Sequence, residues 1–139
     1  MSATYNPAFG SYVDPRTLQL LNGANDIIHT SWGRDGRLMT LLQDAAYKDP
    51  NGRIWYVDKG HKVNGLSVPW FLWRVQPPFV GRARNASVFH DVHCDLKAFP
   101  SPEVHMMFYN IMRMDGVNRV QAFDRWLMVR LFGPRFPGK

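Results

Sequence analysis

The segment Ser87-Val88-Phe89-His90-Asp91-Val92-His93-Cys94-Asp95 combines an apolar helical pattern with the densest set of ionisable side chains in the sequence. On a helix, His90 and His93 are three residues apart and His90 and Cys94 are four apart, so the three share a broad face. The connection that follows is short, and the next helix should therefore return antiparallel. Equal distances on either side of the turn place His105 roughly opposite His93, so that nitrogen and sulfur donors could converge as zinc prefers.

Two interpretations of this segment remain open. His90, Asp91, His93 and His105 could bind zinc, with His90 and Asp91 as catalytic candidates. However, the sequence has no His-Glu-x-x-His or Cys-x-x-Cys motif and a single cysteine. Hydrogen-bonded histidines at a helix pair, with His90 donating to a backbone carbonyl or to an aspartate, need no metal, and we favour this structural interpretation. No cofactor is firmly indicated, and zinc is the alternative to test.

Ser67 is a further catalytic candidate because a serine hydroxyl can act as a nucleophile. Ser67 stands just before Pro69 at a predicted helix start, where serine is usually an N-cap. No Gly-x-Ser-x-Gly motif surrounds it. A capping role is therefore the stronger interpretation.

The rest of the sequence predicts an α+β fold, a small antiparallel sheet of three or more strands followed by about four helices. Strands are expected at residues 38–42, 54–57 and 61–63, and the first two are separated by the turn signal Asp49-Pro50-Asn51-Gly52. Helical periodicity begins near Pro69. The four predicted helices run from Pro69 to the Pro77-Pro78 stop, from Asn85 to about Leu96, from Pro102 to Gly116, and from the Asn118 cap to Gly133.

A length of 139 residues fits one domain. We expect an N-terminal arm over residues 1–36, rich in turn residues, and a single domain over residues 37–139. A short helix is predicted from Pro15, with Asp14 as its N-cap.

The formal charge of +6, with twelve arginines and five lysines, is spread along the chain. Dispersed charge usually marks a solvated surface, so nucleic acid is an unlikely partner and a nucleic-acid-binding accessory role is the weakest candidate function. The first residues lack the basic and apolar regions of a secretory signal. No stretch approaches the roughly 20 apolar residues of a membrane span, and we expect no membrane association.

Short motifs follow one another in a specific order through residues 41–132. They are Tyr47-Lys48-Asp49 with Gly52, then Gly60, Val63-Asn64-Gly65-Leu66-Ser67-Val68-Pro69, Trp73 with Pro77-Pro78, Ala86 through His90-Asp91, Val104-His105-Met106-Met107-Phe108, Gly116-Val117, and Val129-Arg130-Leu131-Phe132-Gly133. In this order they resemble a phage and prophage family known as a domain of unknown function, number thirteen fifty-three in that series. The resemblance covers about two thirds of the chain.

Two positions depart from the family pattern. Asn64 stands where the family has an aspartate, and His105 stands where it has a second aspartate. The amide of an asparagine cannot act as a general base. The resemblance therefore implies a polar centre that has lost carboxylates, with His90 and Asp91 retained. Arg130 lies in an apolar helix, and we expect it to be buried and paired with Asp91 or Asp95.

The resemblance implies a phage virion protein, made in the host cytoplasm and then located in the virion. Our prediction is a non-catalytic structural or assembly protein of the tail or baseplate, whose partners are other virion subunits or further copies of itself. The alternative is a metal-dependent hydrolase that acts on the host cell wall.

Overall fold

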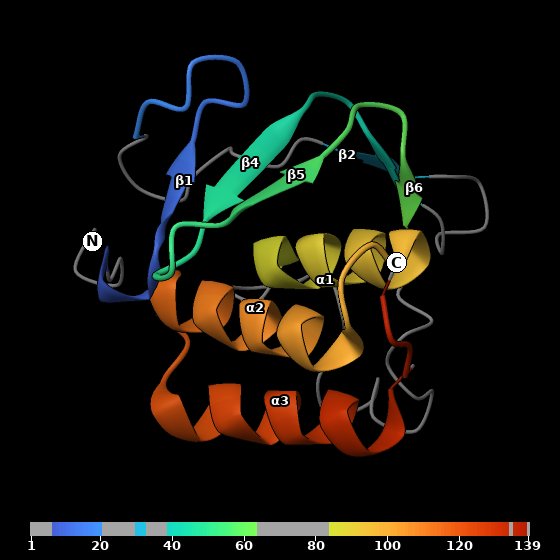
Figure 1. Cartoon of the computed structure of the whole chain (residues 1–139). Coiled ribbons are helices and arrows are strands. Elements are labelled where there is room, and N and C mark those ends of the chain that lie inside the picture. Colours follow the sequence, from blue (N-terminus) through green and yellow to red (C-terminus); the bar gives the residue numbers. More distant parts are fainter. Residues whose placement is uncertain (1–6, 21–29, 33–38, 64–83, 134, 139) are drawn as a thin grey trace.

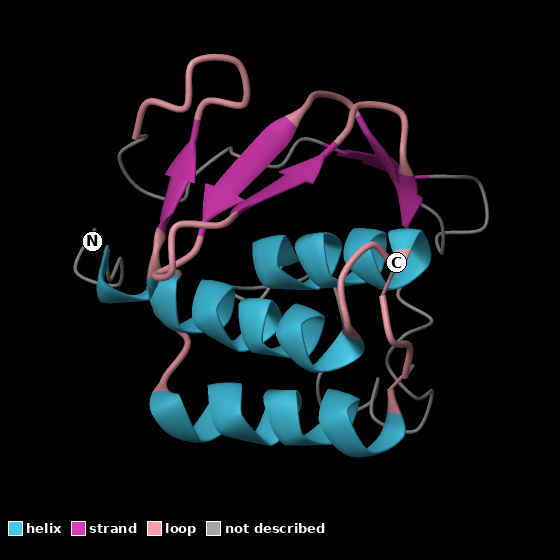
Figure 2. Ribbon diagram, viewed as in Figure 1, coloured by secondary structure: helices cyan, strands magenta, loops and turns pink. Residues whose placement is uncertain are grey.

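Two small antiparallel sheets cover one side of a stack of three helices in the computed structural model (Figure 1). The structure describes residues 7–20, 30–32, 39–63, 84–133 and 135–138. Strands and helices are separated along the chain, with all the described strands before α1 (Figure 2). The predicted α+β class is therefore confirmed.

The first sheet has the strand order β1-β4-β5, formed by Ser11–Val13, Ala45–Lys48 and Ile54–Val57. Tyr47 is the Cα partner of Tyr12 on one side and of Trp55 on the other. The turn between β4 and β5 is the one predicted from Asp49-Pro50-Asn51-Gly52. The Asp49 carboxylate accepts hydrogen bonds from the backbone N–H groups of Asn51 and Arg53, which holds the turn closed.

The second sheet has the order β2-β3-β6, formed by Thr30–Trp32, Met39–Leu41 and Lys62–Val63. The strands predicted at residues 38–42 and 61–63 are confirmed to within a residue, and the one predicted at 54–57 matches β5. Strand β4 was not predicted. Its first three residues are all buried, so it lacks the alternation of apolar and polar residues that indicates a strand.

The helices are α1 (Arg84–Leu96), α2 (Ser101–Met114) and α3 (Arg119–Phe132), with α2 packed between the other two. The predicted cap is confirmed, because the Asn118 side chain accepts from the backbone N–H of Gln121. The sequence predicted about four helices, whereas the described residues contain three α-helices. The predicted helix after Pro69 falls outside the described residues.

The N-terminal region contains the 3-10 turn η2 (Pro7–Phe9) and β1. The helix predicted from Pro15 is wrong. Asp14 does accept from the backbone N–H groups of Arg16 and Thr17, but it closes a turn, and Leu20 then bridges back to Val13. The boundary predicted at residue 36 stays a prediction, and we note that β1 pairs with β4 across it.

The core runs from the first sheet through all three helices, and its aromatic part lies between the sheet and α1. Tyr12, Tyr47, Trp55 and Phe89 are fully buried there. Phe89 of α1 meets both tyrosines, with ring centroids 6.2 Å from Tyr12 and 6.3 Å from Tyr47. Such aromatic contacts add roughly 0.5–1.5 kcal/mol each beyond the area they bury. They fix the position of α1, which carries the histidines. Within the described residues, no helix has the length and apolar character needed to cross a bilayer.

Candidate functional site: a buried histidine pair

His90 of α1 and His105 of α2 face each other where the two helices pack. His90 Nε2 and His105 Nδ1 are 2.8 Å apart, and each residue is 1% exposed. At this distance one nitrogen donates and the other accepts, so at least one ring keeps an unprotonated nitrogen in the contact. Phe108 of α2 packs against the His90 ring, with centroids 4.6 Å apart.

The His90 imidazole is held neutral. Burial, together with charge repulsion from the neighbouring His105 and His93 rings, lowers its pKa to about 3. A base with so low a pKa is unprotonated at neutral pH and binds a proton weakly. His90 therefore takes part in the pair as a neutral imidazole.

His93 is directed towards the sheet. Its Nε2 lies 2.9 Å from the carbonyl oxygen of Tyr56 in β5, and its ring meets Trp55 edge to face with centroids 5.0 Å apart. Because a carbonyl only accepts, Nε2 must donate. Burial lowers the pKa of His93 to about 4, although the hydrogen bond to Tyr56 acts in the opposite direction. His93 thus links α1 to the sheet.

Cys94 and Asp91 complete the polar face of α1. The Cys94 Sγ lies 3.5 Å from His90 Nε2. Burial, and then the charge of Asp91, raise the pKa of the thiol to about 12, so Cys94 stays protonated. A protonated thiol is neither a good nucleophile nor a good metal ligand. Both residues are buried.

The structure brings together part of the predicted site. His105 was predicted opposite His93 but lies opposite His90, about one helical turn away. Over the described residues, no three His, Cys, Asp or Glu side chains gather closely enough to hold a metal ion. Zinc binding by His90, Asp91, His93 and His105 stays a prediction, and Ser67 and Asn64 lie outside the described residues.

The expectation for Arg130 is wrong. Arg130 is exposed on α3 rather than buried. Asp95 instead contacts His61, whose Nε2 lies 3.0 Å from Asp95 Oδ2. The apolar sequence around Arg130 misled the prediction because Val129 is buried whereas Leu131, on the other side, is 51% exposed.

A second buried polar cluster was missed by sequence reasoning. The Tyr12 hydroxyl of β1 donates to Asp115 Oδ2, just after α2, at 2.7 Å. Burial raises the pKa of Asp115 to about 7, and hydrogen bonds from Tyr12 and Asn85 partly offset this. The two residues are 103 positions apart in the sequence, so no local pattern could have indicated the contact.

The fold and the site define an α+β domain with a buried histidine pair between α1 and α2. Residues 39–129 match the family described as "Protein of unknown function (DUF1353)". The chain belongs to this family, and the family predicted from the motifs is confirmed. The association with phages stays a prediction.

Two relatives come from Sinorhizobium fredii (strain NBRC 101917 / NGR234). Uncharacterized protein y4jT is 37% identical over 98 residues, which cover 70% of this chain and 29% of that protein. Uncharacterized protein y4iH is 35% identical over 101 residues, which cover 69% of this chain and 41% of that protein. The chain therefore spans less than half the length of these two curated relatives. No solved structure matches the chain.

Proposed function

We propose that this protein is a non-catalytic structural or assembly component of a phage virion, of the tail or baseplate type. The viral setting of this proposal comes from the family resemblance in the motifs. The assembly role is supported by the outer surface of α3, and the lack of catalysis is supported by the state of the histidine pair.

The observation that carries the proposal is an apolar stripe along α3. Val120, Phe123, Leu127 and Leu131 follow one another at spacings of three, four and four residues, and therefore lie on one face of the helix. Val120 is 70% exposed, Phe123 48% and Leu131 51%. The buried residues Ala122 and Val129 lie on the opposite face.

An exposed apolar stripe of this kind is typical of a surface that another protein covers. Burying such side chains in an interface would gain about 25 cal/mol for each Å² of apolar surface removed from water. We assign the stripe to a neighbouring virion subunit. A second copy of this chain is the other outcome that the experiment below can reveal.

The histidine pair supports a structural centre in place of a catalytic one. His90 Nε2 and His105 Nδ1 share one hydrogen bond, His93 Nε2 donates to a backbone carbonyl, and Cys94 is protonated. These groups hold α1, α2 and the sheet together. General acid–base catalysis at neutral pH needs a group with a pKa near 7, and the lowered pKa values of His90 and His93 do not fit that role.

The test replaces the stripe in the full chain during virion production. In Phe123→Ser/Leu131→Ser, the protein should stay folded but be lost from purified virions, as measured by quantitative mass spectrometry. The matched control is Leu18→Ser/Leu20→Ser, which changes two exposed leucines far along the chain from α3 and should leave the copy number unchanged.

Three outcomes would overturn the proposal. One is the absence of the wild-type protein from purified virions. Another is normal incorporation of the α3 variant. The third is stoichiometric zinc in elemental analysis together with cell-wall hydrolysis that His90→Gln abolishes, because that result would establish the metal-dependent hydrolase instead.

A further inference from the structure

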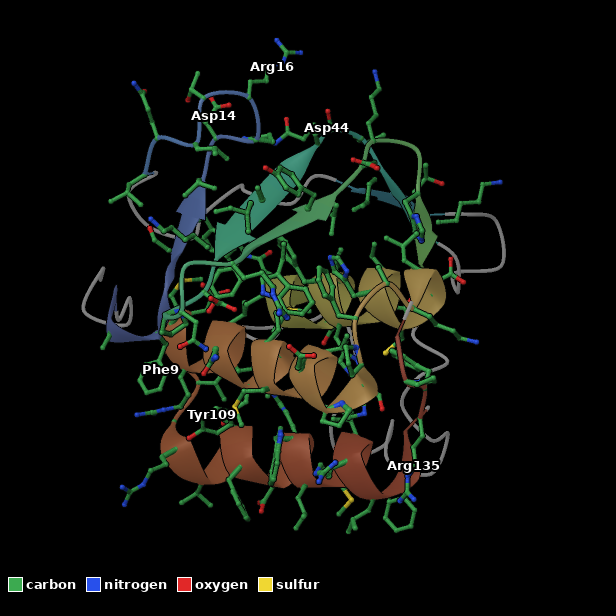
Figure 3. The ribbon with its side chains drawn as sticks, in the orientation of Figure 1. Phe9, Asp14, Arg16, Asp44, Tyr109 and Arg135 are labelled. Carbon is green, nitrogen blue, oxygen red and sulfur yellow. The ribbon has the colours of Figure 1, made fainter. Side chains whose placement is uncertain are left out.

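A cavity of about 780 Å³ lies between the start of α2, the second half of α3 and the C-terminal segment 135–137. This volume falls within the range of pockets that bind small organic molecules. The cavity is on the far side of α2 from the sheet, and Figure 3 shows Arg135 near the C-terminal end of α3. Leu127 and Leu131 of the α3 stripe also line it, whereas Val120 and Phe123 do not.

The wall formed by the C-terminal segment is fixed to α2. Ser101 N–H donates to the Phe136 carbonyl at 2.9 Å, and Phe136 N–H donates to Ser101 Oγ at 3.2 Å. Gly138 follows closely against Phe99 and Pro100, where a Cβ atom would meet backbone at 2.8 Å. The cavity is therefore bounded by a segment with defined contacts.

The charge of the lining is positive. Arg130 and Arg135 both line the cavity and both are exposed, so their guanidinium groups can reach a ligand. The described lining contains no aspartate or glutamate. Two arginines without a neighbouring carboxylate favour an anion, because the guanidinium fork matches the geometry of a carboxylate or phosphate.

The remaining lining is mostly apolar. Trp126, Leu127, Leu131 and Phe136 contribute side chains to it. The Trp126 indole Nε1 is buried and has no hydrogen-bond partner in the part of the chain that the structure describes. Trp126 can therefore report on binding because its side chain is part of the cavity wall.

We propose that this cavity binds an organic anion, a carboxylate or phosphate attached to an apolar or aromatic body. The arginines hold the anionic group, and the apolar side chains, Trp126 among them, hold the body. His105 also lines the cavity, so that a ligand would lie next to the buried histidine pair.

The experiment titrates the full chain with 1-naphthoate and follows the tryptophan indole N–H resonances in ¹⁵N-correlated NMR spectra. Trp126→Phe identifies the Trp126 resonance. We expect this resonance to shift on binding. The neutral analogue 1-naphthalenemethanol should bind at least tenfold more weakly, because it cannot form charge-assisted hydrogen bonds with the arginines. Inorganic phosphate, which has no apolar body, should compete only weakly.

The variant Arg130→Gln/Arg135→Gln should raise the dissociation constant for 1-naphthoate at least tenfold, with an unchanged melting temperature. The matched control, Arg119→Gln, removes an exposed arginine of α3 that does not line the cavity and should stay within twofold of wild type. Equal binding of the acid and the alcohol would overturn the proposal. So would wild-type affinity in the double variant, or a Trp126 resonance that does not move at saturation.

Discussion

The free energy of unfolding should fall as the pH is lowered, because two buried histidines take up protons only when the protein unfolds. His90 and His93 have pKa values of about 3 and 4 in the folded protein, against about 6.5 in an unfolded chain. Between pH 6.5 and 4 the unfolded state therefore binds protons that the folded state does not. The folded state loses stability as pH falls through this window, by about 1.4 kcal/mol per pH unit for each histidine.

Asp115 acts in the opposite direction. Its pKa is about 7 in the folded protein, against about 3.9 unfolded. Between those values the folded state binds the proton and the unfolded state does not, so falling pH stabilises the fold by about 1.4 kcal/mol per unit. One carboxyl thus offsets one of the two histidines.

The net expectation is a loss of about 3 kcal/mol between pH 6.5 and 4.5, a large part of the roughly 5–15 kcal/mol stability of a typical domain. Asp115→Asn removes the offset while keeping an oxygen that accepts from Tyr12. This variant should lose about 5–6 kcal/mol over the same range. The exposed carboxylate of Asp124 on α3 provides the matched control, and Asp124→Asn should behave as wild type.

The assay is urea unfolding at half-unit pH steps, followed by tryptophan fluorescence and by circular dichroism, with linear extrapolation to water. A free energy of unfolding that stays level or rises as pH falls from 6.5 to 4.5 would refute the reasoning. The same slope in wild type and Asp115→Asn would show that Asp115 is not the offsetting group.

Three further predictions follow from single contacts. Gly10→Ala should cost more than about 2 kcal/mol of unfolding free energy, because Gly10 has φ +112° and its Cβ would meet the Lys48 carbonyl oxygen at 2.5 Å. Gly52→Ala, with φ +93° and open space, should cost only about 1 kcal/mol, and equal losses in urea unfolding would contradict this difference. Tyr12→Phe should cost about 1–3 kcal/mol in the same assay, and more at pH 8 than at pH 6, because the hydroxyl stabilises the ionised form of Asp115. Cys94 should react with a thiol reagent only as fast as the protein unfolds, because the thiol is buried with a pKa of about 12, and rapid reaction in the native state would disprove its burial.

Local patterns were sufficient for the elements whose residues alternate or repeat regularly. The strand at residues 54–57 and the helices α1, α2 and α3 carry such patterns and were predicted. Strand β4 was missed because Ala45, Ala46 and Tyr47 are all buried, so burial from both sides removed the alternation. At Asp14 the same side-chain capping that begins a helix also closes a turn, and the sequence could not separate the two.

The candidate site was predictable only in part. Spacing along α1 placed His90, His93 and Cys94 on one helix, but the pairing of His90 with His105 depends on how α1 and α2 cross. The Tyr12–Asp115 contact depends on the whole fold. Burial and the neighbouring histidines also lower the pKa of His90, and the sequence alone does not indicate this change.

Strand β1 has a consequence for any attempt to isolate the family module. The family match begins at residue 39, whereas β1 occupies residues 11–13 and forms the outer strand beside β4. A fragment that starts at residue 39 would leave the backbone N–H and C=O groups of β4 open along one edge, which is a template for strand addition by another molecule. Expression of that fragment should therefore give edge-to-edge aggregates, and the N-terminal strand acts as the protein's own protection against them.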